Sequence, residues 1–107
     1  MAATIRASHI LLMHAGVPES SSDRSRAAAL EAMTRLRDKI KSGDVDFAEA
    51  AQTLSDCPSG EDGGDLGRFS PGMMVPEFDK ASFALEVNEL SDIVETAFGF
   101  HLILRTE

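Results

Sequence analysis

The sequence predicts an α+β domain in which a single β-sheet packs against helices, with the element order β-α-α-β-α-β-β. Apolar runs near the two ends of the chain, at residues 4–13 and 99–106, are typical of strands. Between them, apolar residues recur at every third or fourth position, as in amphipathic helices. A chain of 107 residues is long enough for one hydrophobic core, so we expect one domain over residues 1–107.

Residues 4–13 are predicted to form a central strand. Alternate residues from Ile5 to Met13 fall on one face, and His9 is among them. The second half of the run is apolar on both faces, which is typical of a strand that is covered on both sides. If the two terminal strands are neighbours, His9 can meet His101 in the middle of the sheet.

Two helices are expected next, after a polar loop at residues 14–22. The first is predicted to run from Ser22 or Asp23 to about Ser42, where Gly43 provides a stop. Its apolar stripe consists of Leu30, Met33, Leu36 and Ile40. The second begins at Asp46, a capping residue, and is expected to bury Phe47, Ala50, Ala51 and Leu54.

The second half of the chain alternates turns with short elements. A Gly- and Pro-containing loop at residues 55–64 precedes a strand from Asp65 to Phe69. A turn at 70–72 leads to a helix that opens at Pro76. A strand near residues 93–96 and the last strand, from Gly99 to Thr106, complete the predicted sheet.

Composition and charge exclude several classes of function. The net charge of −8 and the absence of Trp and Tyr disfavour nucleic-acid binding, because phosphate backbones are held by Lys and Arg. No apolar run is long enough to span a membrane. The single Cys57 rules out an internal disulfide. With no signal peptide at the start, we expect a cytoplasmic protein, or alternatively a module excised from an exported protein.

Five segments, in the order and spacing found here, resemble the parvulin family of peptidyl-prolyl cis/trans isomerases. They are Ala7–Leu11, Ser55–Ser59, Gly64–Phe69, Pro76–Leu85 and Gly99–Glu107. The resemblance implies an FKBP-like, four-stranded antiparallel sheet surrounded by three to four helices. It also implies isomerisation of X–Pro bonds without a cofactor. We expect a monomer that binds proline-containing peptides or unfolded proteins.

The resemblance also assigns candidate site residues. Leu66, Met74 and Phe78 match the family's apolar proline pocket, although their types alone would favour a plain core. His9 and His101 match its paired histidines, which we expect to support and tune the site rather than to transfer protons. Thr96 matches a hydroxyl that can extend their hydrogen-bond network. Cys57 matches a position held by Cys or Asp, where a thiolate can ease twisting of the amide by electrostatics.

Two departures from the phosphate-directed members of the family bear on substrate choice. Met13 stands where those members have a lysine, and Glu19 lies about where they have arginines. Arg24 and Arg26 come later, and one of them could fold back toward the site. Phe98 replaces a small polar residue and makes the rim of the pocket more apolar. We therefore expect no strong preference for phosphorylated substrates.

Parts of the sequence also bear on three other functions. A Cys–His hydrolase could use Cys57 with one of the histidines, but no hydrolase signature surrounds this cysteine. A metal site is disfavoured because the His and Cys residues lack ligand spacing. A non-catalytic peptide-binding or chaperone module that uses the same groove stays open, because sequence alone does not separate it from an enzyme.

Overall fold

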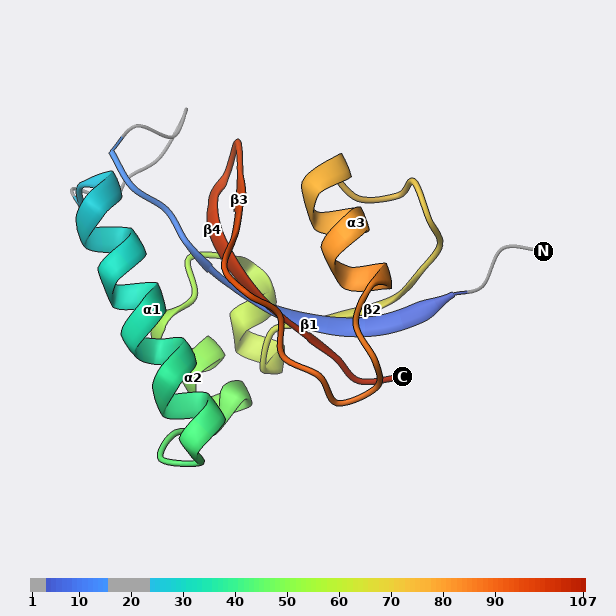
Figure 1. Ribbon diagram of the computed structural model, residues 1–107, viewed down its shortest axis with the longest axis horizontal. Helices are drawn as coiled ribbons and strands as arrows, with labels where there is room; N and C mark the ends of the chain where they lie inside the picture. The colour runs from blue at the N-terminus through green and yellow to red at the C-terminus, as the bar shows by residue number, and fades with distance from the viewer. Residues whose placement is uncertain (1–3, 16–23) are drawn as a thin grey trace.

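The computed structural model describes residues 4–15 and 24–107. Within these ranges the chain forms the predicted order of strands and helices, with one added 3-10 helix (Figure 1). The elements are β1 (Ile5–Leu12), α1 (Arg26–Ser42), α2 (Phe47–Leu54), η1 (Pro58–Asp62), β2 (Asp65–Phe69), α3 (Pro76–Phe83), β3 (Val94–Thr96) and β4 (Gly99–Arg105). None of the described helices is long and apolar enough to cross a membrane.

The two terminal strands lie side by side at the centre of an antiparallel sheet, as the sequence predicts. The strand order is β2-β1-β4-β3. In the register of the central pair, His9 faces Ile103 and Leu11 faces His101. Because residues 9 and 11 share a face, the two histidines are diagonal neighbours on that same face.

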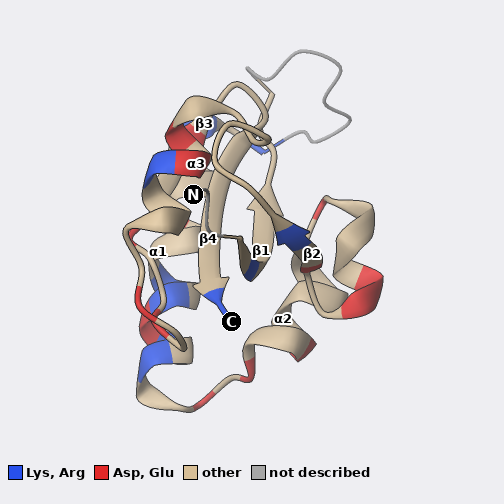
Figure 2. Cartoon of the chain, turned by 90° about the vertical axis from the view of Figure 1, so that its right-hand side faces the viewer, with Lys and Arg blue, Asp and Glu red and all other residues tan. Residues whose placement is uncertain are grey.

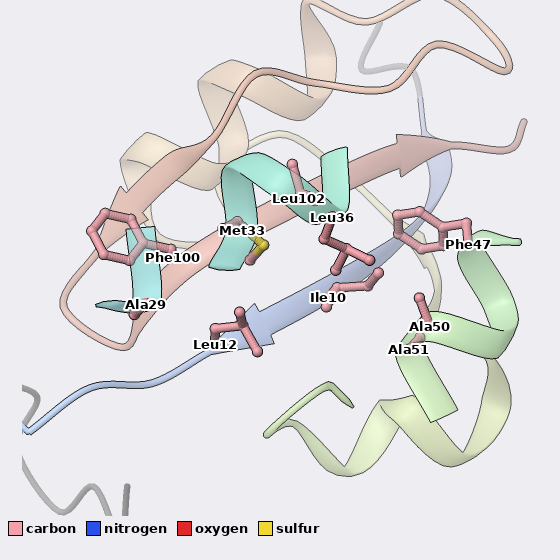
Figure 3. Packing of buried hydrophobic residues seen from close by; sticks show 10 residues of the cluster. All are labelled: Ile10, Leu12, Ala29, Met33, Leu36, Phe47, Ala50, Ala51, Phe100 and Leu102. Atoms are coloured by element: carbon pink, nitrogen blue, oxygen red, sulfur yellow. The ribbon is translucent and has the colours of Figure 1, made fainter. Parts of the chain in front are cut away.

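One face of the sheet is covered by α1 and α2. Ile10 and Leu12 from β1 project into this core together with Phe100 and Leu102 from β4 (Figure 3). The helices contribute the other side chains of this core, namely Ala29, Met33, Leu36, Phe47, Ala50 and Ala51. This core fixes β1 against β4 from the side opposite to the histidines.

The other face packs against α3 and carries both histidines. Phe78 from α3 joins a second core with five residues of the strands and of the segment after the helix: Ile5, Ala7, Phe69, Leu85 and Ile103. Figure 1 shows α3 on the side of β1 away from α1. The polar pair is therefore enclosed between the sheet and one short helix.

The first helix begins later than the sequence suggested. Ser25 is its N-cap, and the hydroxyl accepts a hydrogen bond from the Ala28 N–H over 3.1 Å, so Arg26 is the first helical residue. The predicted starts at Ser22 and Asp23, like most of the predicted loop, lie outside the described residues. The helix ends at Ser42 as predicted, because Gly43 adopts a left-handed conformation with φ of 86°.

Two apolar residues that were expected to be buried are instead substantially exposed. Leu30 of α1 is 37% exposed and Leu54 of α2 is 46% exposed. In α1 the buried position is Ala29, which is fully enclosed and allows a close approach to the sheet. The buried stripe of α1 is therefore rotated by about one residue from the predicted one at its N-terminal end.

The predicted loop at residues 55–64 contains the 3-10 helix η1 and then passes very close to β1. The His9 N–H donates to the Gly64 carbonyl over 2.9 Å. Gly64 has φ of 87°, and a Cβ atom there would lie 2.3 Å from the His9 carbonyl oxygen. Glycine at this position therefore lets the Cys57 loop close onto the strand that carries His9.

Candidate active site

An apolar cavity of about 180 Å³ lies over the face of the sheet that carries the histidines. Its lining consists of His9, Cys57, Leu66, Met74, Val75, Phe78, Phe98 and His101. The structure thus brings seven of the eight predicted site residues to one cavity, and Thr96 lies behind them in contact with His101. Val75 is the lining residue that the sequence analysis missed. The signal for it was Pro76, which favours an extended residue before it.

The apolar walls of the cavity come from three different parts of the chain. Leu66 belongs to β2, Phe78 to α3 and Phe98 to the turn between β3 and β4. Phe78 is only 3% exposed, whereas Phe98 is 51% exposed. The cavity therefore has an enclosed aromatic wall and an open aromatic rim.

A continuous hydrogen-bonded chain runs behind the cavity. The Nδ1 atoms of His9 and His101 are 3.0 Å apart, and His101 Nε2 is 2.7 Å from Thr96 Oγ1. The Phe98 N–H donates to the same hydroxyl oxygen over 3.1 Å. The chain therefore links the apolar rim to the buried imidazoles.

The hydroxyl of Thr96 has a single proton, and this decides the tautomers of the pair. If Thr96 donates to His101 Nε2, then His101 donates from Nδ1 to His9, and the His9 proton lies on Nε2. The reverse direction would leave the Thr96 proton without an acceptor among the described residues. We assign the first arrangement. In it, the buried Nε2–H of His9 is the one group of this hydrogen-bonded network that has no partner among the described residues.

Both imidazoles are neutral at physiological pH. His9 is 6% exposed and His101 is 4% exposed. Burial lowers the pKa of His9 to about 4. Burial, with a smaller contribution from the charge of His9, lowers the pKa of His101 to about 4 as well. The ring of Phe78 stands nearly perpendicular to both, at centroid distances of 5.6 and 5.4 Å, and excludes water from them.

Cys57 is held at the edge of the cavity by a short network with β1. The Ser55 hydroxyl oxygen accepts hydrogen bonds from the Leu11 N–H at 3.0 Å and the Cys57 N–H at 3.3 Å. The Cys57 sulfur, on a partly exposed residue, accepts a hydrogen bond from the Ser59 hydroxyl over 3.1 Å. Within the described residues no hydrogen bond joins the sulfur to either histidine. This geometry lacks the nucleophile–base pair of a Cys–His hydrolase.

The two arginines singled out in the sequence both have carboxylate partners. Arg24 does fold back toward the Cys57 loop, where Nη1 lies 3.8 Å from Asp56 Oδ2. Arg26 binds Glu95 through two hydrogen bonds of 2.8 and 2.7 Å. Neither guanidinium therefore brings an uncompensated positive charge to the site.

A larger hollow of about 330 Å³ lies elsewhere on the molecule and is lined by polar and charged residues. It is lined by Arg6, Ser8, Asp62, Asp65, Thr106 and Glu107. Arg6 is paired with both Asp65 and Glu107 there, so its charge is already satisfied. In residues 4–15 and 24–107, no group of three or more His, Cys, Asp or Glu side chains is arranged to hold a metal ion.

Comparisons with known proteins agree with this geometry. A family model described as rotamase, PPIC-type PPIase domain, matches residues 9–107. The chain is 41% identical over 112 residues to the peptidyl-prolyl cis-trans isomerase Pin1 of Arabidopsis thaliana, covering 95% of this chain and 94% of that protein. The peptidyl-prolyl isomerase ESS1 from Candida albicans superposes with a TM-score of 0.94 at 37% identity, over 97% of this chain and 63% of that one. The solution structure of TbPIN1 has a TM-score of 0.91 at 37% identity and covers both chains completely.

These relatives share the antiparallel sheet and helices described above, and the family match includes every residue that lines the apolar cavity. The fold and the enzyme class predicted from the five segments are thereby confirmed. The chain belongs to the PPIC-type peptidyl-prolyl cis-trans isomerases, the parvulin family.

Proposed function

We propose that this isomerase holds the proline ring of its substrate in the apolar cavity, between Leu66, Met74 and Phe78, and prefers an uncharged residue before the proline. The observation that carries the proposal is the cavity itself, whose walls are apolar and which is backed, among the described residues, by the neutral histidine pair and Thr96. Phe98, half-exposed at the rim, would contact the residues that flank the proline.

The proposed chemistry needs binding and desolvation, and no bond is broken. Rotation about a peptide bond has a barrier of about 18–20 kcal/mol because amide resonance is lost. The twisted amide is less charge-separated than the planar one, so an apolar site that excludes water stabilises it relative to the ground state. Uncatalysed prolyl isomerisation takes roughly 10–100 s, which leaves ample room for acceleration.

In this proposal the histidines support and tune the site. Each fixes the tautomer of the other, and Thr96 fixes the direction of the chain. Cys57, at the edge, would act through the electron density of its sulfur, since hydrolysis is not part of the reaction.

The charge around the site argues against phosphate recognition. Acidic residues lie in η1, in the turn that precedes α2 and, as Glu49, in α2 itself (Figure 2). In η1, directly after Cys57, Glu61 and Asp62 are exposed. Arg24 lies against Asp56 and Arg26 against Glu95, so a neighbouring carboxylate offsets the positive charge of each guanidinium. Glu19, the acid predicted in place of arginines, lies outside the described residues.

Matched peptides test this substrate preference. We expect kcat/KM for a Leu-Pro peptide to equal or exceed that for the same peptide with phosphoserine before proline, measured by exchange NMR or a protease-coupled assay. Arg24→Ala and Arg26→Ala should leave the ratio between the two peptides unchanged, because neither guanidinium binds the phosphate. A preference above about tenfold for the phosphopeptide, equivalent to about 1.4 kcal/mol, would contradict the proposed preference for an uncharged residue before the proline. Inactivity on every peptide would instead favour the non-catalytic binding module.

Removal of the Thr96 hydroxyl is expected to weaken the histidine network. In Thr96→Val, His101 Nε2 loses its donor while it stays buried, which should lower the free energy of unfolding by about 1–3 kcal/mol. The isomerase activity of Thr96→Val should fall as well. Thr96→Ser retains the hydroxyl, so its stability and its activity should stay close to those of the wild type. Urea unfolding and peptide isomerisation of the two variants check this. If the valine and serine variants lose stability and activity to the same extent, the hydrogen bond has no role.

A further inference from the structure

The chain that leads from β2 into α3 forms a tight turn directly before a wall of the cavity. The Met73 N–H donates to the Ser70 carbonyl over 3.3 Å. Between them stand Pro71 and Gly72, and Gly72 has φ of 87°. Proline at the second position and a left-handed glycine at the third are the residues of a type II turn. Met74, which lines the cavity, follows this turn immediately.

The amide of the glycine in such a turn takes no part in the hydrogen bond that closes it. Here the Gly72 N–H donates to the Asp79 carboxylate, at 3.1 Å from Oδ1. The backbone N–H of the same aspartate donates to the Val75 carbonyl over 2.9 Å. One residue of α3 therefore holds both ends of the segment that carries Met74.

Asp79 also follows Phe78 directly in the chain, so its two hydrogen bonds tie one cavity wall to another. We propose that Asp79 is a positioning residue that sets the spacing between Met74 and Phe78 before a substrate arrives. A preformed wall lowers the cost of ordering the site on binding. The inference rests on the proposed function of Met74 and Phe78 as proline-binding walls.

A second acid in the same helical turn provides a matched control. Glu77 and Asp79 both lie in the first turn of α3, where a negative charge interacts favourably with the helix dipole. Glu77 is exposed, and among the described residues no hydrogen bond joins it to the turn. The two variants Glu77→Ala and Asp79→Ala thus remove the same charge, but only the second removes the contact with Gly72.

The proposal predicts a separation between KM and kcat. In Asp79→Ala, KM for a Leu-Pro peptide should rise about fivefold, in line with the loss of one ordinary hydrogen bond. The value of kcat should stay close to that of the wild type, because the substrate that does bind meets the same site. Asp79→Asn keeps an acceptor oxygen and should restore most of the affinity, while Glu77→Ala should keep the wild-type KM.

A double-mutant cycle with Met74→Ala connects the effect to the wall. If Asp79 acts through Met74, Asp79→Ala should add little to the rise in KM that Met74→Ala causes alone. Full additivity, or equal KM values for Asp79→Ala and Glu77→Ala, would overturn the positioning role. A Met74→Ala variant with an unchanged KM would instead overturn the proline-binding wall itself, so the two failures are distinguishable.

Discussion

Phe78→Leu is expected to lower kcat/KM by at least about tenfold, the scale on which a hydrophobic site responds to a change in shape. Phe78 is 3% exposed, lines the cavity and stands perpendicular to both buried imidazoles. A leucine fills part of the volume but leaves a path for water to the histidines. Isomerisation of a Leu-Pro peptide, measured on variants whose unfolding is followed in parallel, checks this. Leucine is preferable to alanine, because Phe→Ala in a core costs about 3–5 kcal/mol and threatens the fold.

Two comparisons make this prediction specific. Phe83→Leu alters the same second core, since Phe83 packs edge-on against Phe69 at 5.7 Å, but it does not line the cavity. This variant should lose stability and keep most of its activity. Cys57→Ser should lose less activity than Phe78→Leu, because the proposed chemistry depends on desolvation. The reverse order, in folded variants, would put the main catalytic contribution on the sulfur.

The histidine pair is expected to make the free energy of unfolding depend on pH well above the range in which carboxylates titrate. In the folded chain burial lowers the pKa of both rings to about 4, whereas the unfolded chain has values near 6.5. Between these pKa values the unfolded state binds more protons than the folded state. The contribution of the histidine pair to the free energy of unfolding is therefore fully present above pH 6.5 and decreases as the pH falls toward 4. With two rings, the loss approaches about 2.7 kcal/mol for each pH unit.

Urea unfolding at a series of pH values between 7.5 and 5, together with NMR titration of the imidazoles, tests this dependence. Hydrogen bonding to Arg6 and Arg26 lowers the pKa of Asp65 and Glu95 respectively. These carboxylates therefore affect the free energy of unfolding at a more acid pH than the histidines do. In the double variant His9→Leu, His101→Leu, the free energy of unfolding should no longer depend on pH in this way above pH 5. A ring of the pair that titrates near pH 6.5 in the native protein would contradict the buried, neutral pair.

Local sequence signals predicted much of the fold because they depend on few neighbours. Asp46 caps α2 as expected, by accepting a hydrogen bond from the Glu49 N–H over 3.2 Å. The bounds of β2 agree with the prediction because Gly63 and Gly64 precede the strand and Pro71 and Gly72 follow it closely. The meeting of His9 with His101 followed from the pairing of the terminal strands and their common face.

Features that depend on tertiary packing were not predictable in the same way. Leu30 and Ala29 are adjacent and both apolar, so only the position of the sheet decides which one is buried. Arg24 finds Asp56 across 32 positions of sequence, a contact that no local pattern indicates. The hydrogen bond from Gly72 to Asp79 likewise depends on how a turn lies against a helix. The candidate site was therefore predictable in its main residues, whereas the groups that hold them in place were not.

The central pairing of β1 with β4 has a consequence for the order in which this protein acquires activity during its synthesis. The His9–His101 contact joins residues 92 positions apart, and both cores need side chains from the last strand. A ribosome-bound chain that lacks β4 has neither the paired imidazoles nor a complete core. Contacts of such long range form late and slow folding. The nascent chain therefore exposes apolar strands, and its site is complete only once β4 is free to pair with β1.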